Sequence, residues 1–205
     1  MSDLAFHTKL FTEVFVTLVV IMDPVGTIPM FLALTSGRSA KHRRRLAWQA
    51  VLVAIAVITA FALFGQQILD YLGITVPALQ GAGGLLLVLV ALELLTGKQE
   101  APEDAPSSNV ALVPLGTPLL AGPGAIVATM VFVQRAHDVA DYVAIGLGVL
   151  LVHVCLWLAM RFAGRIHLLL GDGGTTLVTR IAGLLLSAIA VQMVADAVRA
   201  FIKMG

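Results

Sequence analysis

Continuous apolar stretches, each containing few polar residues, occupy most of this chain. None shows the strict alternation of a half-buried strand or of a membrane barrel, so the pattern indicates helices. Each stretch approaches or exceeds the roughly 20 residues that a helix needs to cross a bilayer. The pattern therefore predicts six membrane-spanning helices, at about residues 10–34, 46–69, 77–97, 110–134, 140–161 and 179–201.

Proline and glycine interrupt the first and the fourth of these stretches, within residues 23–29 and 114–124. Proline lacks an amide hydrogen and clashes with the preceding turn, and glycine is a weak helix former. Asp is favoured just before a helix and proline at its first position. Asp23-Pro24 and Gly122-Pro123 are therefore predicted to begin two half-helices near the middle of the membrane.

The second half of the chain repeats the first at a constant offset of 99 residues. Under this offset Pro24 matches Pro123, Gly65 matches Gly164, and residues 84–87 match residues 183–186. Three crossings return a chain to the other side of the membrane, so such a repeat is inverted. Inverted repeats with interrupted helices at corresponding positions are typical of secondary transporters.

The expected fold class is all-α. We expect a polytopic membrane protein whose six transmembrane helices form two inverted three-helix repeats, with discontinuous helices 1 and 4. The first repeat covers residues 1–97 and the second covers residues 109–205. Residues 98–108, which are rich in Pro, Glu and Ser, are the predicted cytoplasmic linker.

Charge predicts the orientation, because cytoplasmic loops carry an excess of Lys and Arg. One side of the predicted membrane has nine cations: Arg38, Lys41, Arg43, Arg44, Arg45, Lys98, Arg161, Arg165 and Arg180. The other side has four: Lys9, Arg135, Arg199 and Lys203. The more basic side is therefore expected in the cytoplasm and both termini outside. The basic run at 41–45 anchors this topology, and no nucleic-acid partner is expected.

Composition excludes a soluble domain. Charged residues make up 12% of the chain and hydrophobic residues 59%, whereas soluble domains carry about 25% charged residues. The mean hydropathy is +0.98. The single cysteine, Cys155, excludes an intramolecular disulfide and a cysteine-based metal cluster. No nucleotide-binding, metalloprotease or nucleophile-elbow motif is present, so we expect neither an enzyme nor a cofactor.

The two interruptions are the candidate substrate site. Each half-helix would direct its N-terminal amides, which carry partial positive charge, toward a small polar cavity at the membrane centre. The candidate binding residues are Asp23, Pro24, Val25, Gly26, Thr27, Thr117, Gly122, Pro123, Gly124 and Ala125, and Thr129 is expected in the same cavity. Two alternatives stay open: the interruptions are simple kinks, or Asp23 only caps its half-helix.

Three titratable residues within the spans are candidates for coupling or gating: Asp23, Glu93 and His153. An acid at the depth of Asp23 costs roughly 2.5–3.5 kcal/mol on insertion scales, which favours a functional role. Glu93 lies near a predicted cytoplasmic end, where its carboxylate can extend to the headgroups instead. His153 is as well explained by a neutral imidazole bonded to a neighbouring helix. Asp196 and Arg199 are expected to form an interfacial pair.

The chain resembles the MarC family of bacterial inner-membrane proteins. The resemblance is carried by residues 23–31 (Asp-Pro-Val-Gly-Thr-Ile-Pro-Met-Phe) and 118–126 (Pro-Leu-Leu-Ala-Gly-Pro-Gly-Ala-Ile), with support from residues 82–84 and 179–185. It covers essentially the whole chain. It implies six spans, two discontinuous helices and, in some members, transport of glycine, alanine or similar amino acids driven by an ion gradient.

These observations lead to one functional hypothesis and several alternatives. The hypothesis is a secondary transporter of small neutral amino acids in the bacterial inner membrane, with periplasmic termini and protons or sodium as the coupling ion. The alternatives are an exporter of other small metabolites or drugs, and a non-transporting channel or sensor. The oligomeric state is left open.

Overall fold

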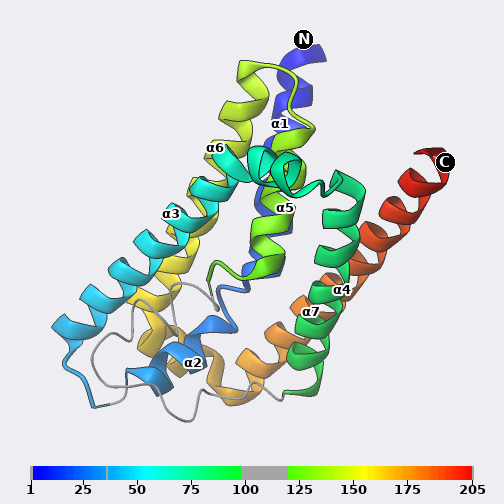
Figure 1. Ribbon diagram of the computed structural model, residues 1–205. Coiled ribbons are helices and arrows are strands. Elements are labelled where there is room, and N and C mark those ends of the chain that lie inside the picture. Colours follow the sequence, from blue (N-terminus) through cyan, green and yellow to red (C-terminus); the bar gives the residue numbers. More distant parts are fainter. Residues whose placement is uncertain (1, 36, 98–119, 205) are drawn as a thin grey trace.

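The computed structural model describes residues 2–35, 37–97 and 120–204, and within these ranges the chain forms helices and contains no strand (Figure 1). The helices are α1 (Ser2–Met22), α2 (Thr27–Leu34), α3 (Ala40–Leu72), α4 (Val76–Thr96), α5 (Pro123–Gln134), α6 (Val139–Arg161) and α7 (Ala163–Met204). The predicted linker at 98–108 and the first part of the predicted fourth span lie outside the described residues.

Four helices, namely α3, α4, α6 and α7, are long and apolar enough to cross a membrane. They correspond to the second, third, fifth and sixth predicted spans, which are confirmed as helices. The first predicted span is divided into α1 and α2 by residues 23–26. The described part of the fourth is the shorter apolar helix α5. The all-helical membrane architecture is therefore established, whereas the six-crossing inverted repeat stays a prediction.

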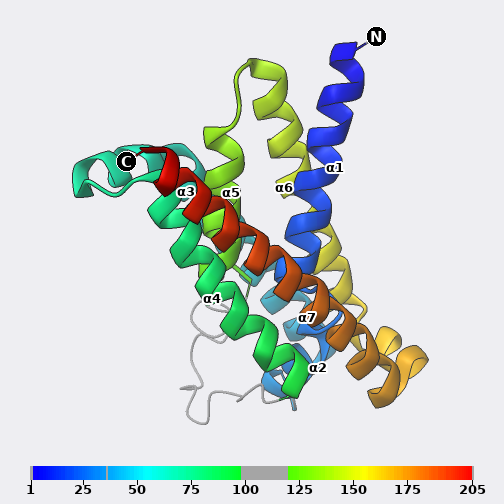
Figure 2. The same cartoon turned by 90° about the vertical axis from the view of Figure 1, so that its right-hand side faces the viewer.

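Helix α7 consists of two segments that meet at an angle. Gly171 has φ 64° and ψ 180°, a conformation that is left-handed and not helical. Such a positive φ suits glycine because a β-carbon would be strained there. The short segment before Gly171 lies at the lower end of the molecule, and the long segment after it rises toward the C-terminus (Figure 2). The helix therefore begins several residues before the predicted span at 179.

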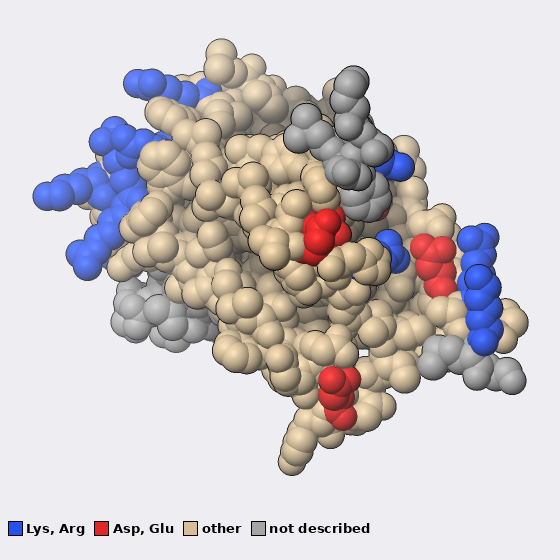
Figure 3. Space-filling view, turned by 90° about the horizontal axis from the view of Figure 1, so that it is seen from above, with Lys and Arg blue, Asp and Glu red and all other residues tan. Residues whose placement is uncertain are grey.

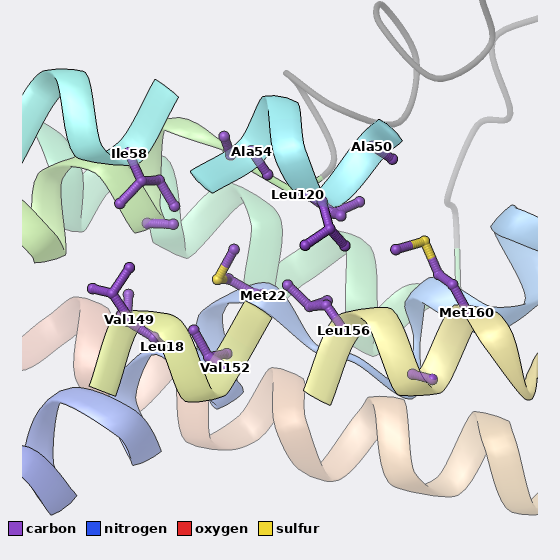
Figure 4. Close-up of a cluster of buried hydrophobic side chains, with 14 of the residues drawn as sticks. Leu18, Met22, Ala50, Ala54, Ile58, Leu120, Val149, Val152, Leu156 and Met160 are labelled. Atoms are coloured by element: carbon purple, nitrogen blue, oxygen red, sulfur yellow. The ribbon is translucent and has the colours of Figure 1, made fainter. Parts of the chain in front are cut away.

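Helices α1, α3 and α6 form the main core. Leu18 and Met22 of α1 pack with Ile58 of α3 and Leu156 of α6 (Figure 4), and each of these side chains is nearly or completely buried. Leu120, which precedes α5, enters the same cluster. The residues just before the two interruptions are thereby brought into one apolar core.

Helices α4 and α7 lie side by side and run in opposite directions (Figures 1 and 2). Gly84 of α4 packs on the main chain of α7, so that a β-carbon there would lie 2.8 Å from the carbonyl oxygen of Ala190. Gly183 of α7 packs on α4 in the same way, 3.2 Å from the carbonyl oxygen of Ala91. Small residues allow helix backbones to approach closely in membranes. The two contacts are equivalent under the 99-residue offset, which matches Gly84 with Gly183 and Ala91 with Ala190.

The outer surface of the molecule is apolar. Leu63 of α3, Leu85 of α4, Leu150 of α6 and Leu184 of α7 are all more than half exposed. Charged side chains are sparse in the view from above, and most of the visible surface is neither basic nor acidic (Figure 3). Such extended apolar surface is incompatible with a water-exposed monomer and is suited to lipid.

Candidate functional site

The first interruption is a tight turn between α1 and α2. Asp23 has φ 36°, a left-handed conformation that Asp and Asn tolerate better than other non-glycine residues. Its carboxylate oxygen Oδ1 accepts a hydrogen bond from the Gly26 amide at 3.0 Å, and its carbonyl oxygen accepts one from the Thr27 amide at 3.0 Å. Pro24 and Val25 form the turn. The regular helix begins at Thr27, three residues later than Asp23-Pro24 predicted.

The capping role of Asp23 uses only one of its two carboxylate oxygens. The residue is 7% exposed, and Oδ2 receives no hydrogen bond from the part of the chain that is described. The carboxylate lies against Gly26, and a β-carbon on Gly26 would also lie 3.0 Å from the Thr179 hydroxyl. A buried carboxylate oxygen with unused acceptor capacity therefore lies beside a hydroxyl from α7.

The second interruption ends at Gly122-Pro123, where α5 begins as predicted. Gly122 has extended geometry, with φ −61° and ψ 159°, and its carbonyl accepts hydrogen bonds from the amides of Ala125 and Ile126. Proline at the first helical position needs no partner because it has no amide hydrogen. These bonds leave the Gly124 amide as the first N–H group of α5 without an acceptor in its own helix.

Apolar side chains fill the space next to the start of α5. Leu87 of α4 packs directly on Gly124, and Ile21 of α1 lies close to it. The Thr27 hydroxyl donates to the carbonyl of Asp23 in the turn, and the Thr129 hydroxyl donates to the carbonyl of Ala125 in its own helix. The described residues between the interruptions therefore pack as an apolar cluster, where the sequence predicted a polar cavity. Thr117 lies outside the described residues.

A hollow of about 240 Å³, lined by both polar and apolar residues, opens below the apolar cluster. Gly26 connects it to the Asp23 turn, and Glu93 of α4 lines it. His167 and Asp172, which form an ion pair at 3.4 Å, stand at its rim. Its other lining residues are Pro29, Leu94, Gly97, Thr175, Thr176 and Thr179. We call it the lower hollow.

A second hollow, of about 360 Å³, opens at the opposite end of the same helices. Its polar lining comes from α1, α4, α5 and α7: Glu13, Thr17, Gln80, Arg135, Gln192 and Asp196. Ala128, Val131, Phe132, Ala188, Ile189 and Met193 complete it. We call it the upper hollow. The predicted pair of Asp196 and Arg199 is confirmed at 3.7 Å.

The other two coupling candidates lie in different surroundings. Glu93 faces the lower hollow, and no cation of the described chain lies within salt-bridge distance of it. His153 is 1% exposed, and its Nδ1 is 2.7 Å from the carbonyl oxygen of Val149, one turn earlier in α6. The expected bond to a neighbouring helix is therefore replaced by one within its own helix. His153 lines neither hollow.

Sequence reasoning missed the contribution of α7 to the lower hollow. Thr179, Thr175 and His167 were not among the candidate residues, because nothing local distinguishes them from polar residues near a helix end. One signal was present for Thr179: the 99-residue offset pairs it with Gln80, so both repeats carry a polar side chain at this position.

Three titratable residues, His7, Asp138 and Asp141, lie close together near the N-terminus and have a structural role. Asp141 accepts hydrogen bonds from the His137 amide at 2.9 Å and lies 3.1 Å from the His7 ring. Asp138 caps α6 by accepting from the Asp141 amide at 2.8 Å. These bonds attach α1 to the turn between α5 and α6.

An interrupted helix, several long apolar helices and a lipid-compatible exterior together define an integral membrane protein of the multi-pass class. Comparison with known proteins identifies the family. Residues 8–202 match the model of the MarC family integral membrane protein, and the chain belongs to this family.

Its relatives have similar length. A UPF0056 membrane protein of Methanocaldococcus jannaschii is 38% identical over 96% of this chain and 98% of its own. One of Archaeoglobus fulgidus is 34% identical over 95% of this chain and 94% of its own. UPF0056 membrane protein YhcE of Escherichia coli is 32% identical over the same shares. No solved structure matches the chain.

Proposed function

We propose that this protein is a secondary transporter that moves small neutral amino acids of the glycine and alanine class by alternating access. The observation that carries the proposal is the pair of hollows at opposite ends of the same helices, separated by an apolar layer. A carrier needs one site that is reached in turn from either side, and a closed layer between two vestibules is the arrangement that such a cycle requires.

The helices pass from one hollow to the other through apolar residues. Along α4, Gln80 lines the upper hollow and Glu93 the lower one, with the buried Leu87 between them. Along α7, Thr179 lines the lower hollow and Gln192 the upper one. The equivalent buried position in α7 is Leu186, which packs with Leu87 and Val20 in one cluster.

The lining of the two hollows supports an inverted repeat. Half of the residues that line the lower hollow have their 99-residue counterparts in the lining of the upper one. The pairs are Pro29 with Ala128, Gln80 with Thr179, Glu93 with Gln192, Leu94 with Met193, and Gly97 with Asp196. Together with the reciprocal glycine contacts of α4 and α7, this favours a pseudo-two-fold axis in the membrane plane. Rocking about that axis would exchange the open and closed ends.

The groups near the apolar layer suit a small zwitterion. The free Oδ2 of Asp23 would accept the substrate ammonium, and the Gly124 amide at the start of α5 would bind its carboxylate. The lower hollow, about 240 Å³, is smaller than the roughly 300–1,000 Å³ of sites for drug-sized ligands. The upper hollow, at about 360 Å³, falls within that range, so it is the narrower lower hollow that favours glycine or alanine over a drug.

The proposal includes the remaining expectations from the sequence. Glu93, which lines the lower hollow, and Asp23, whose turn reaches it through Gly26, are the carboxylates proposed to take up a proton or sodium ion. The proposed orientation has the lower end, which carries most of the Lys and Arg residues, in the cytoplasm of a bacterial inner membrane and both termini outside; the excess of positive charge supports it. The protein is proposed to be a carrier and not an enzyme.

The decisive experiment measures uptake of labelled glycine and alanine by proteoliposomes under imposed proton or sodium gradients. Asp23→Asn keeps the capping acceptor and tolerates the left-handed turn, so the fold is preserved. It removes a charged partner worth about 1.5–3 kcal/mol, so substrate affinity is expected to fall about 10- to 100-fold.

The matched control is Asp70→Asn, which makes the same change at an exposed residue whose carboxylate accepts a hydrogen bond from Gln66. This control is expected to transport normally. Absence of saturable flux in the native protein under every gradient refutes the carrier. Loss of membrane insertion in Asp23→Asn, with normal flux in whatever protein remains, would restrict Asp23 to capping.

A further inference from the structure

Four arginines line a hollow at the lower end of the molecule whose lining shares no residue with either transport hollow. Arg43 and Arg44 come from the beginning of α3, and Arg161 and Arg165 from the junction of α6 and α7. The hollow measures about 240 Å³. None of the four side chains has a carboxylate of the described residues within 4.0 Å. The cluster therefore concentrates positive charge without a described counter-ion.

The floor of this hollow is apolar. Phe31, Met160 and Ala163 line it and are at most 2% exposed. Four arginines and buried apolar side chains lining one hollow match a molecule with an anionic head and an apolar body. An inorganic anion would need only the arginines and not the apolar floor.

Aromatic residues place the hollow at the level of the lipid headgroups. The guanidinium of Arg161 lies 5.4 Å from the Trp157 ring, and Trp157 meets Trp48 edge-to-face with ring centroids 6.5 Å apart. Trp48 is 52% exposed at the molecular surface. Tryptophan is enriched at membrane interfaces because its ring is amphipathic.

The charge near two helix starts favours an anion at this hollow. Ser39 caps α3 by accepting from the His42 amide, but the first turn of α3 contains no acidic residue to balance Arg43 and Arg44, although the start of a helix favours negative charge. The other two arginines flank the beginning of α7, where the Phe162 carbonyl already accepts hydrogen bonds from the Arg165 and Ile166 amides, and the first turn contains no acidic residue. A phosphate group would compensate both helix starts and the arginines.

We propose that Arg43, Arg44, Arg161 and Arg165 form a binding site for the phosphate of an anionic phospholipid. Basic pockets between transmembrane helices bind such headgroups elsewhere. The site shares no lining residue with either transport hollow, so lipid binding can be tested without assuming transport.

The test measures the thermal stability of the full-length protein in a non-ionic detergent during titration with phosphatidylglycerol or phosphatidylcholine. The variant Arg161→Gln/Arg165→Gln leaves the topological charges of residues 41–45 in place. The control, Arg199→Gln/Lys203→Gln, removes the same charge at the opposite end. Size-exclusion chromatography verifies that each variant is folded and monodisperse before titration.

The native protein and the control are expected to be stabilised selectively by phosphatidylglycerol. The arginine variant should require an about 30-fold higher concentration of this lipid, since each charge contributes a factor of about five. An unchanged titration of the arginine variant, or an equal loss in the control, overturns the site. If inorganic phosphate stabilises the protein as much as phosphatidylglycerol does, the site binds free phosphate and the lipid proposal is refuted. If the arginine variant does not fold, Arg43→Gln/Arg44→Gln provides the same test from α3.

Discussion

Replacing Gly84 by alanine places a methyl group against the backbone of α7. The new β-carbon would lie 2.8 Å from the carbonyl oxygen of Ala190, whereas ordinary contact begins at 3.4 Å. The two helices must therefore separate by roughly 0.6 Å, because a backbone oxygen cannot rotate away. A gap of this size weakens dispersion contacts by about a quarter to a half. Overpacking of this kind costs about 1–3 kcal/mol of stability.

The reciprocal position provides a graded comparison. A β-carbon on Gly183 would lie 3.2 Å from the carbonyl oxygen of Ala91 and 3.0 Å from the β-carbon of Leu94, so a smaller separation suffices. Alanine also gains about 0.5–1 kcal/mol over glycine within a helix. Gly183→Ala should therefore remain close to the native stability, while Gly84→Ala is clearly destabilised. The double variant should lose less than the sum, because one separation relieves both contacts.

Reversible unfolding in mixed micelles, followed by helical circular dichroism, measures these differences. Gly146→Ala is the matched control, since a β-carbon there meets nothing within 4 Å and should stabilise α6. If Gly84→Ala is as stable as Gly146→Ala, the close approach of α4 and α7 is refuted. Additive effects in the double variant would argue against a shared interface.

Two further predictions concern the hollows. Gly26→Ala should displace the Asp23 carboxylate that caps α2 and so reduce substrate binding at least tenfold. Gly173→Ala, where a β-carbon meets nothing within 4 Å, should leave binding unchanged. Equal binding by the two variants would contradict the packing around Gly26. In a Cys155→Ala background, Thr179→Cys and Gln80→Cys should react with membrane-impermeant thiol reagents added on opposite sides of the membrane. Labelling of both cysteines from the same side would disprove two separate vestibules.

The interruptions and helices could be predicted because their causes are local. Backbone groups in lipid must bond within their own segment, so apolar runs become helices. Gly122-Pro123 begins α5 as expected, because proline suits the first position of a helix. The start of α2 was predicted three residues too early, because the left-handed Asp23 inserts a turn that sequence preferences do not reveal.

The hydrogen bond of His153 shows a different limit. Its burial followed from its place in an apolar run, but its partner depended on the rotation of α6 against its neighbours. The ring bonds to Val149 in its own helix and contributes to neither hollow. Similarly, the lining of the lower hollow by His167 depends on the break at Gly171.

The amino-acid sequence alone determined the membrane class, the family, the helices and the approximate positions of the two Pro/Gly interruptions, since hydropathy and proline act over a few neighbouring residues. Only the tertiary structure decided that Thr179 meets Gly26 beside Asp23 and that apolar side chains close the space between the breaks. It also decided that polar residues form two hollows instead of one cavity. These features depend on how closely α4 and α7 approach, which is set by glycine contacts between residues far apart along the chain.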